Sequence, residues 1–143
     1  SGNVIDYDFI IYKLGQLNKL YDIQSIAYDN WNSHHIAPKL YEEGFDLIEF
    51  RQGFKSMNAP TKELQAMVES KKFNHGNNPV LRWMVGNASV KSDPAGNIKL
   101  EKDTRSPNKK IDGLISNIMA FGLWLDKPDL NKSYLEEGDL YII

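Results

Sequence analysis

Two aspartates of this chain stand at the predicted ends of secondary-structure elements, where side chains that carry out chemistry are often placed. Asp29 follows a short β-branched and aromatic run, residues 23–28, and Asp112 falls in the first turn of an apolar helix predicted over residues 109–125. Two such carboxylates brought together repel each other unless cations neutralise them, and hard divalent ions prefer oxygen ligands. The pair would therefore suit Mg²⁺ or Mn²⁺ in a two-metal site that hydrolyses phosphodiesters.

Each aspartate also has a simpler interpretation. Asp29 would begin a turn, and Asp112 would favour the positive end of a helix dipole. For either residue taken alone, this account is more common than catalysis. The two residues by themselves leave both interpretations open.

Positive charge is concentrated in the middle of the chain. The 143 residues carry a net charge of -2, but residues 51–112 hold twelve bases against six acids, whereas residues 1–50 hold three bases against eight acids. A basic segment of this kind either contacts nucleic-acid phosphates or forms a solvated face. The candidates for phosphate contact are Lys99, Lys102, Arg105, Lys109 and Lys110.

The residue types that are missing exclude several classes of site. The chain has no cysteine, which excludes disulfides, thiolate zinc sites and cysteine nucleophiles, so any metal must be held by oxygen or imidazole. His34 and His35 are adjacent and do not share a helical face, whereas His75 precedes a turn and is a further candidate for the site or for DNA contact. No apolar run reaches the roughly 20 residues of a membrane helix, and we expect a soluble, cytoplasmic protein without a membrane partner.

The order of predicted elements indicates an α/β fold. Hydrophobic periodicity and turn residues predict helix, strand, helix and strand over residues 8–21, 23–28, 36–41 and 46–50, an alternation typical of parallel pairing. They then predict helices over 60–70, from Pro79 and over 109–125, with a hairpin between the last two and a strand over 140–143. Trp31 and Trp83 are predicted to pack in the interior.

Four segments resemble the large terminase family of tailed phages and prophages, of HK97 type, and occur in the same order. They are residues 26–31, 50–60, 75–87 and 107–115, which read IAYDNW, FRQGFKSMNAP, HGNNPVLRWMVGN and PNKKIDGLI. The resemblance implies an RNase H-like nuclease domain, with a mixed sheet flanked by helices, that cuts concatemeric viral DNA during packaging. It also implies that Asp29 and Asp112 are catalytic, metal-binding acids.

The resemblance further implies that this chain is part of a larger protein. The family has an acid on a first β-hairpin that finds no match here, and a GxxxxGK[ST] phosphate loop is absent, so we expect a domain truncated at its N-terminal side, weak or inactive alone. We expect residues 1–2 to be a scar of tag removal, 3–127 a partial nuclease domain and 128–143 an acidic tail. In the whole protein the implied partners are double-stranded DNA, the portal and the small terminase subunit.

Two other functions stay open at this point. A non-catalytic docking module would use the acidic tail, around Glu136, Glu137 and Asp139, to contact portal or motor partners. An RNase H-like remnant in a prophage would have no present activity. Neither alternative is excluded by composition or by spacing.

Overall fold

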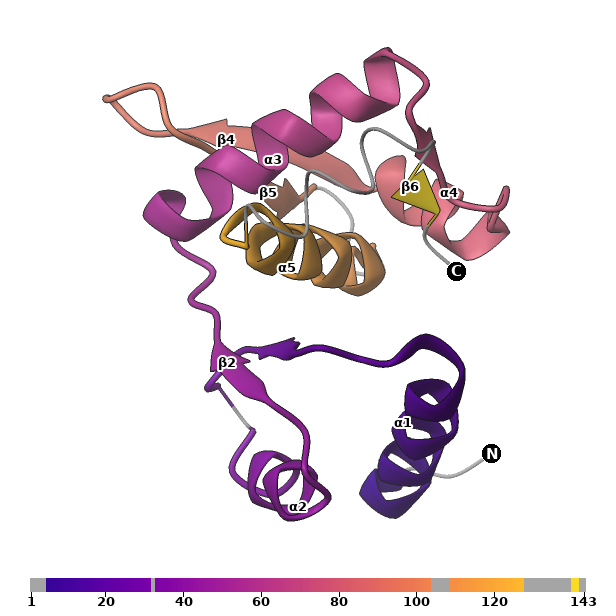
Figure 1. The fold of residues 1–143 in the computed structure, drawn as a ribbon. Coiled ribbons are helices and arrows are strands. Elements are labelled where there is room, and N and C mark those ends of the chain that lie inside the picture. Colours follow the sequence, from indigo (N-terminus) through magenta and orange to yellow (C-terminus); the bar gives the residue numbers. More distant parts are fainter. Residues whose placement is uncertain (1–4, 32, 104–108, 128–139, 142–143) are drawn as a thin grey trace. The chain divides into compact units, whose positions relative to one another are not determined.

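The computed structural model describes residues 5–31, 33–103, 109–127 and 140–141. The chain divides into two compact units, Ser1–Phe50 and Arg51–Ile143, and each is described by itself. Figure 1 labels their helices and strands.

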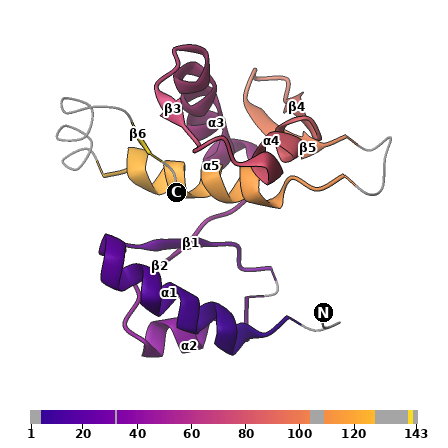
Figure 2. The same cartoon turned by 90° about the vertical axis from the view of Figure 1, so that its right-hand side faces the viewer.

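The first unit is a helix–strand–helix–strand segment, as the sequence predicts. It contains α1 (Tyr7–Tyr21), β1 (Ile26–Tyr28), α2 (Ala37–Glu42) and β2 (Leu47–Glu49). β1 and β2 pair in parallel, with Ile26 opposite Leu47 and Tyr28 opposite Glu49. Figure 2 shows α1 and α2 on the same side of this strand pair. Parallel pairing requires a crossover connection, and α2 with its flanking loops supplies it.

Local capping sets where α1 begins. The Asp6 side chain accepts a hydrogen bond from the Phe9 amide at 3.0 Å, which identifies Asp6 rather than Asp8 as the N-cap. Asp8 instead forms an ion pair with Lys39 of α2 at 2.6 Å, and the hydrogen bond that the Lys39 ammonium donates to Asp8 raises the pKa of Lys39 above its usual value. The pair is exposed to solvent, so it contributes little to stability.

The second unit contains the remaining elements. They are α3 (Phe54–Glu69), β3 (Phe73–Asn74), α4 (Pro79–Val85), β4 (Ala88–Ser92), β5 (Ile98–Lys102), α5 (Asp112–Leu125) and β6 (Leu140–Tyr141). β4 and β5 form the predicted antiparallel hairpin, and β3 pairs in parallel with β6. The described strands thus form three two-stranded sheets instead of the single mixed sheet expected from the sequence. No helix in these parts of the chain is long and apolar enough to cross a membrane.

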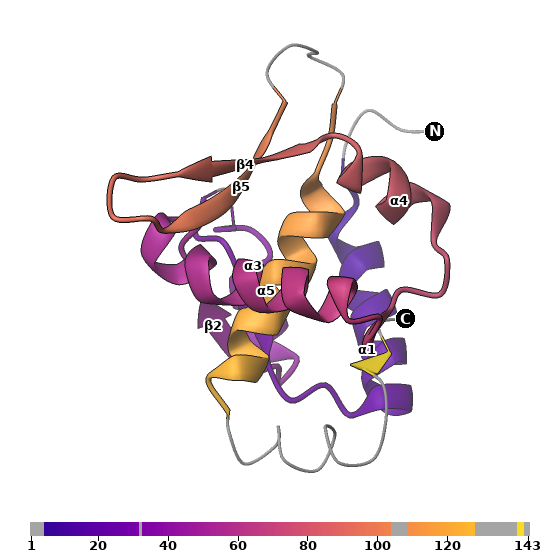
Figure 3. The same cartoon turned by 90° about the horizontal axis from the view of Figure 1, so that it is seen from above.

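The core of the second unit lies where α3 packs against α5. α3 contacts both β5 and α5, and Figure 3 shows the hairpin above these two helices. Ile118 of α5 is 0% exposed and Met57 of α3 is 1% exposed. Other buried apolar residues of the two helices are Leu64, Met67, Leu114, Met119, Phe121 and Leu123. Each large side chain buried in this way contributes about 1.5–3 kcal/mol.

The predicted start of α3 at Pro60 is wrong. The helix begins six residues earlier, at Phe54, and Pro60 lies inside it. A proline at an interior position removes one helical hydrogen bond and strains the preceding turn, which costs about 3 kcal/mol or more. Met57 and Pro60 are both buried, so burial of this face offsets the loss and the helix continues through the proline.

The predicted burial of the two tryptophans is also wrong. Trp31 is 83% exposed and Trp83 is 50% exposed. Trp31 lies in the turn after β1, and Trp83 lies on α4, in which no residue is buried. The strand predicted at 140–143 is confirmed for Leu140–Tyr141, whereas residues 142–143 and the acidic segment 128–139 lie outside the described residues.

Replacement of Ile118 by alanine should destabilise the protein by about 2–5 kcal/mol, because a cavity would remain between α5 and α3. Urea unfolding at equilibrium would measure the change. Val68→Ala on α3 is the matched control: Val68 is 54% exposed, and its truncation should cost less than about 0.5 kcal/mol. Equal losses for the two variants would contradict the assignment of the core.

The β4–β5 turn should lose stability in acid. Asp93 accepts hydrogen bonds from the Asn97 side chain at 2.8 Å and from the amides of Asn97 and Ala95 at 2.8 and 3.0 Å. The bond from the Asn97 side chain is the main cause that lowers the pKa of the Asp93 carboxyl below 3.8. A pKa lowered by folding gives stabilisation that is complete above the unfolded-state value and is lost as pH falls through the folded-state value. Urea unfolding between about pH 6 and pH 2 should therefore show that the free energy of unfolding falls more steeply for the wild type than for Asp93→Asn.

Candidate functional site

Asp29 directly follows β1, as the sequence predicts. It is half-buried at the carboxyl end of a parallel strand, the sheet edge at which ligands usually bind in α/β proteins. Its Oδ1 accepts a hydrogen bond from the Trp31 amide at 3.0 Å, so Asp29 also begins a turn. A carboxylate has about four lone-pair positions, so the contact with the Trp31 amide does not by itself prevent Asp29 from binding a metal.

Asp112 is the first residue of α5 and is exposed to solvent. The predicted helix over 109–125 is confirmed, with its start three residues later. Ile111 is the N-cap, and no side chain caps this helix end. Since the amides of the first helical turn have no intrahelical acceptor, the acid lies where the helix dipole favours negative charge.

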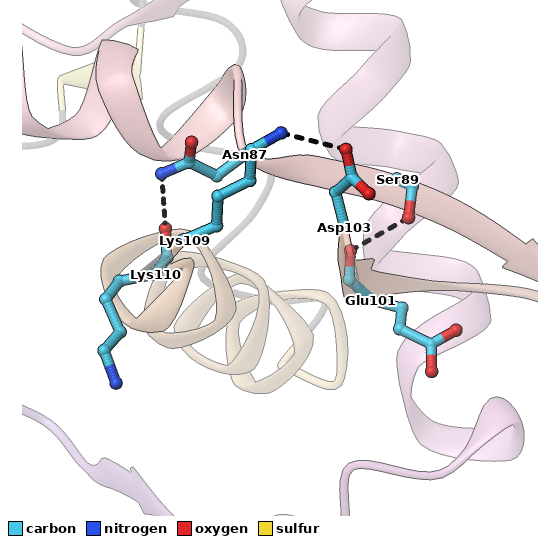
Figure 4. Close-up of polar contacts among 6 residues, drawn as sticks. All are labelled: Asn87, Ser89, Glu101, Asp103, Lys109 and Lys110. Atoms are coloured by element: carbon cyan, nitrogen blue, oxygen red, sulfur yellow. Dashed lines mark hydrogen bonds and ion pairs between the residues drawn. The ribbon is translucent and has the colours of Figure 1, made fainter. Parts of the chain in front are cut away.

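Two residues of the segment 75–87 form hydrogen bonds with the backbone before and after Asp112. The Asn87 side chain, 6% exposed, donates a hydrogen bond from Nδ2 to the Lys110 carbonyl at 3.0 Å. The Gly113 amide donates to the Met84 Sδ at 3.2 Å. Figure 4 shows the Asn87 side chain directed at the Lys110 carbonyl. The short segment that carries the acid is therefore bound on each side of it.

Lys109, one of the predicted phosphate contacts, forms an ion pair inside the unit. Its Nζ lies 2.9 Å from Oδ2 of Asp103, the residue that follows β5 (Figure 4). The side chains are 30% and 15% exposed. Lys110 is exposed and lies two residues before Asp112. Contact of Lys109 with a phosphate would thus require exchange of its carboxylate partner, whereas Lys110 projects from a segment that is already anchored.

Two of the other predicted phosphate contacts, Lys99 and Lys102, lie on β5 of the hairpin. The Lys99 ammonium lies 5.2 Å from the centre of the Phe54 ring, a distance typical of a cation–π contact. Lys102 is exposed at the end of β5. Arg105 lies outside the described residues.

His75 lies beside the start of α5. Together with Asn78, Met84, Gly113, Ser116 and Asn117 it lines a cavity of about 330 Å³, with α4 on one side and α5 on the other. Its Nδ1 is inaccessible and has no hydrogen-bond partner among the residues that the structure describes. A buried polar atom without a partner is uncommon and needs an explanation. The position of His75 next to Gly113 keeps it as a candidate residue.

Asp29 belongs to the first unit and Asp112 to the second. Within the described ranges, no group of three or more histidine, cysteine, aspartate or glutamate side chains could hold a metal ion. Two carboxylates nevertheless fit a hard divalent ion in type, because Mg²⁺ commonly binds one or two protein carboxylates and keeps several waters. The described residues therefore offer the correct donor atoms for such an ion but not a complete cage.

Comparison with known proteins gives the family. Residues 1–127 match the model of the terminase large subunit endonuclease domain. The chain belongs to this family. The match covers the first unit and residues 51–127 of the second, with both candidate aspartates and the four segments that carried the resemblance, so the family assignment from the sequence is confirmed.

Individual relatives agree with this assignment. The chain is 28% identical over 138 residues to the protein YmfN of Escherichia coli K12, with 95% of this chain and 30% of that protein covered. It is 32% identical over 123 residues to the terminase large subunit of Enterobacteria phage HK97, with 85% of this chain and 24% of that protein covered. The chain thus spans less than a third of either relative.

Solved structures support the fold. The crystal structure of the HK97 bacteriophage large terminase matches with a TM-score of 0.73 and 31% identity, covering 85% of this chain and 26% of that one. The large terminase nuclease from thermophilic phage G20c matches with a TM-score of 0.65 and 16% identity, covering 84% of this chain and 63% of that one. The mixed α/β fold is therefore that of terminase nuclease domains, which are RNase H-like.

Sequence reasoning assigned no role to three residues that shape this region. Met84 and Asn87 lie in a family-like segment that carries no predicted function, and the sequence predicts no role for Asp103. The side-chain amide of Asn87, between α4 and β4, is only a weak indication of an anchoring role. The partners of these residues lie between 6 and 29 positions away, which no local pattern encodes.

Gly113→Ala should destabilise the protein, because the new Cβ would lie 3.0 Å from the Met84 Sδ and 3.7 Å from its Cε. Crowding of this kind typically costs about 1–3 kcal/mol. In a Met84→Ala background the crowding is gone, and the same change should be neutral or stabilising by up to about 1 kcal/mol, since alanine favours helices. A double-mutant cycle in urea measures the coupling. Equal costs in both backgrounds would show that Met84 does not restrict Gly113.

Proposed function

We propose that this chain is the metal-dependent nuclease part of a phage or prophage terminase large subunit, which cuts concatemeric viral DNA during packaging. The observation that carries the proposal is the family match over residues 1–127 together with the positions of Asp29 and Asp112 within it. Each aspartate lies at the end of an element, one after a parallel strand and one at the start of a helix. Nuclease domains of this family are typically metal-dependent.

In this proposal Asp29 and Asp112 are catalytic and share the binding of divalent ions, Mg²⁺ or Mn²⁺. When bound, two such ions activate the attacking water and stabilise the leaving oxygen of a phosphodiester. The half-buried Asp29 is oriented by the Trp31 amide, and Asp112 is held by the contacts on each side of it. Each carboxylate is thus oriented within its own unit, which reduces the cost of orientation.

The basic middle segment would bind the DNA backbone without reading its sequence. Lys110 lies next to Asp112 and would hold the scissile phosphate, with Lys99, Lys102, Arg105 and Lys109 as further contacts. Lys109 would exchange Asp103 for a phosphate oxygen. His75 is proposed to lie near the reacting strand, because its cavity extends to Gly113.

The whole protein's partners are part of the same proposal. They are double-stranded DNA, the portal and the small terminase subunit, in the cytoplasm of the host bacterium. The proposal also places one further metal ligand on the family's first β-hairpin, for which this chain has no matching segment. By that account the chain alone would be weak or inactive.

Mn²⁺ should bind between Asp29 and Asp112 and broaden nearby NMR signals, because the ion is paramagnetic. The amide signals of residues 29–31 and 111–114 should broaden together on titration. Asp29→Asn and Asp112→Asn should each remove the broadening at both places, since a shared ion loses a charged ligand. Asp126→Asn, an exposed acid at the other end of α5, is the matched control and should change nothing. Broadening at only one aspartate would contradict a shared site.

Plasmid nicking in Mn²⁺ tests the activity itself. The full-length large subunit should nick DNA, and Asp112→Asn should reduce the rate by at least about 100-fold, the upper end of what altering an outer-shell partner costs. The isolated chain should be slower than the full-length protein. If wild-type protein fails to nick DNA in both forms, the docking or remnant alternative replaces this proposal.

A further inference from the structure

We infer that Met84 and Asn87 are positioning residues, which hold the segment Lys110–Gly113 from both sides and so fix where the Asp112 carboxylate projects. The inference rests on the proposed function of Asp112. It assigns a task to the segment 75–87, which carries no residue proposed to bind the metal ions.

The start of α5 is not fixed by its own sequence. Its N-cap is Ile111, with φ -135° and ψ 13°, and no side chain caps the first turn. α2 and α3 also begin without a side-chain cap, whereas Asn78 caps α4 by accepting hydrogen bonds from the amides of Val80 and Leu81. A helix end without a cap leaves unpaired amides and tends to fray. Contacts from outside α5 are therefore needed if the first turn is to stay ordered around Asp112.

Asn87 supplies the contact before the acid. Its Nδ2 donates to the carbonyl of Lys110, two residues ahead of Asp112, at 3.0 Å. Asn87 is itself fixed by its backbone: its amide donates to the Met84 carbonyl at 3.0 Å, and its carbonyl accepts from the Asp103 amide at 3.0 Å. A buried side chain whose backbone is bonded on both sides has little freedom, so it is a rigid anchor.

Met84 supplies the contact after the acid. The Gly113 amide, in the first turn of α5, has no acceptor within the helix and donates to the Met84 Sδ at 3.2 Å. A thioether is a weak acceptor, so this contact directs the chain more than it stabilises it. Gly113 also lets the chain come this close, because a Cβ at this position would lie 3.0 Å from the sulfur.

One turn of chain thus carries both contacts. Met84 and Asn87 are three residues apart and are joined by the hydrogen bond between the Asn87 amide and the Met84 carbonyl. Displacement of this turn would move both sides of the segment Lys110–Gly113 together. Metal ligands need placement to within about 0.5 Å, and their supporting contacts usually provide it. The geometry therefore suits support of a metal ligand better than general packing.

The test compares Asn87→Ala with Asn58→Ala. The Asn58 Oδ1 accepts from the Ile98 amide at 2.9 Å, so this control also removes one part-buried asparagine contact between two elements of the same unit, away from Asp112. Both variants should lower the melting temperature by similar amounts. At a temperature well below both transitions, only Asn87→Ala should raise the Kd for Mn²⁺, by about 10–100-fold. Only Asn87→Ala should also accelerate amide hydrogen exchange at Gly113 and Leu114, by about tenfold.

Met84→Leu is a second variant, which tests the inference even if Asn87→Ala does not fold. The change conserves volume and removes the sulfur acceptor, so the protein should fold while exchange at Gly113 accelerates and Mn²⁺ binds more weakly. If exchange at Gly113 stays at its wild-type rate in both Asn87→Ala and Met84→Leu, the inference is overturned.

The outcomes also separate this inference from the proposed function. If Asp112→Asn does not weaken Mn²⁺ binding, the proposed function fails, and the positioning of a metal ligand fails with it. If Asp112→Asn weakens binding while Asn87→Ala and Met84→Leu behave like Asn58→Ala, the metal site stands and the positioning inference alone is wrong.

Discussion

The packing of α5 against α3 determines where the candidate acid of the second unit lies. Ile118 and Met57 are almost completely buried, and six further apolar residues of the two helices are buried with them. Because α5 is a rigid rod, burial of its middle fixes the direction of its whole axis. Asp112 at the start of that axis is exposed, so one helix both builds the core and presents the acid.

The direction of the α5 axis does not by itself place the Asp112 carboxylate. The backbone of the first helical turn must be fixed as well. α1 and α4 achieve this with their own caps, Asp6 and Asn78. α5 begins at an uncapped isoleucine, and its first turn is held by contacts from Met84 and Asn87. The start of this helix is thus determined by tertiary contacts, which gives the family-like segment 75–87 a structural purpose even though it contributes no acid.

Several of the basic residues in the range 51–112 already have partners within the unit, so the charge count overstates how many are available to a ligand. Lys109 is paired with Asp103, and the Lys99 ammonium lies over the Phe54 ring. Lys91 lies 3.3 Å from Glu101 across the hairpin. These ammonium groups already have partners within the unit, and a polyanion would have to compete with them. Net positive charge in a segment therefore indicates an attraction for polyanions without showing which ammonium groups are available.

The sequence by itself determined the order of the helices and of every strand except β3, the hairpin, the parallel pairing of the first unit and the family. Hydrophobic period, the Asp93–Asn97 turn and the four motif segments all act over short stretches of chain, so they can be recognised without a structure. Tertiary structure alone decided that α3 runs through Pro60, that Trp31 is exposed, that β3 pairs with β6, and that Asn87 anchors Lys110. Each of these depends on a partner or a buried face formed by residues distant in the chain. Burial can then outweigh local preference, and a side chain acquires its role only when folding brings its partner within reach.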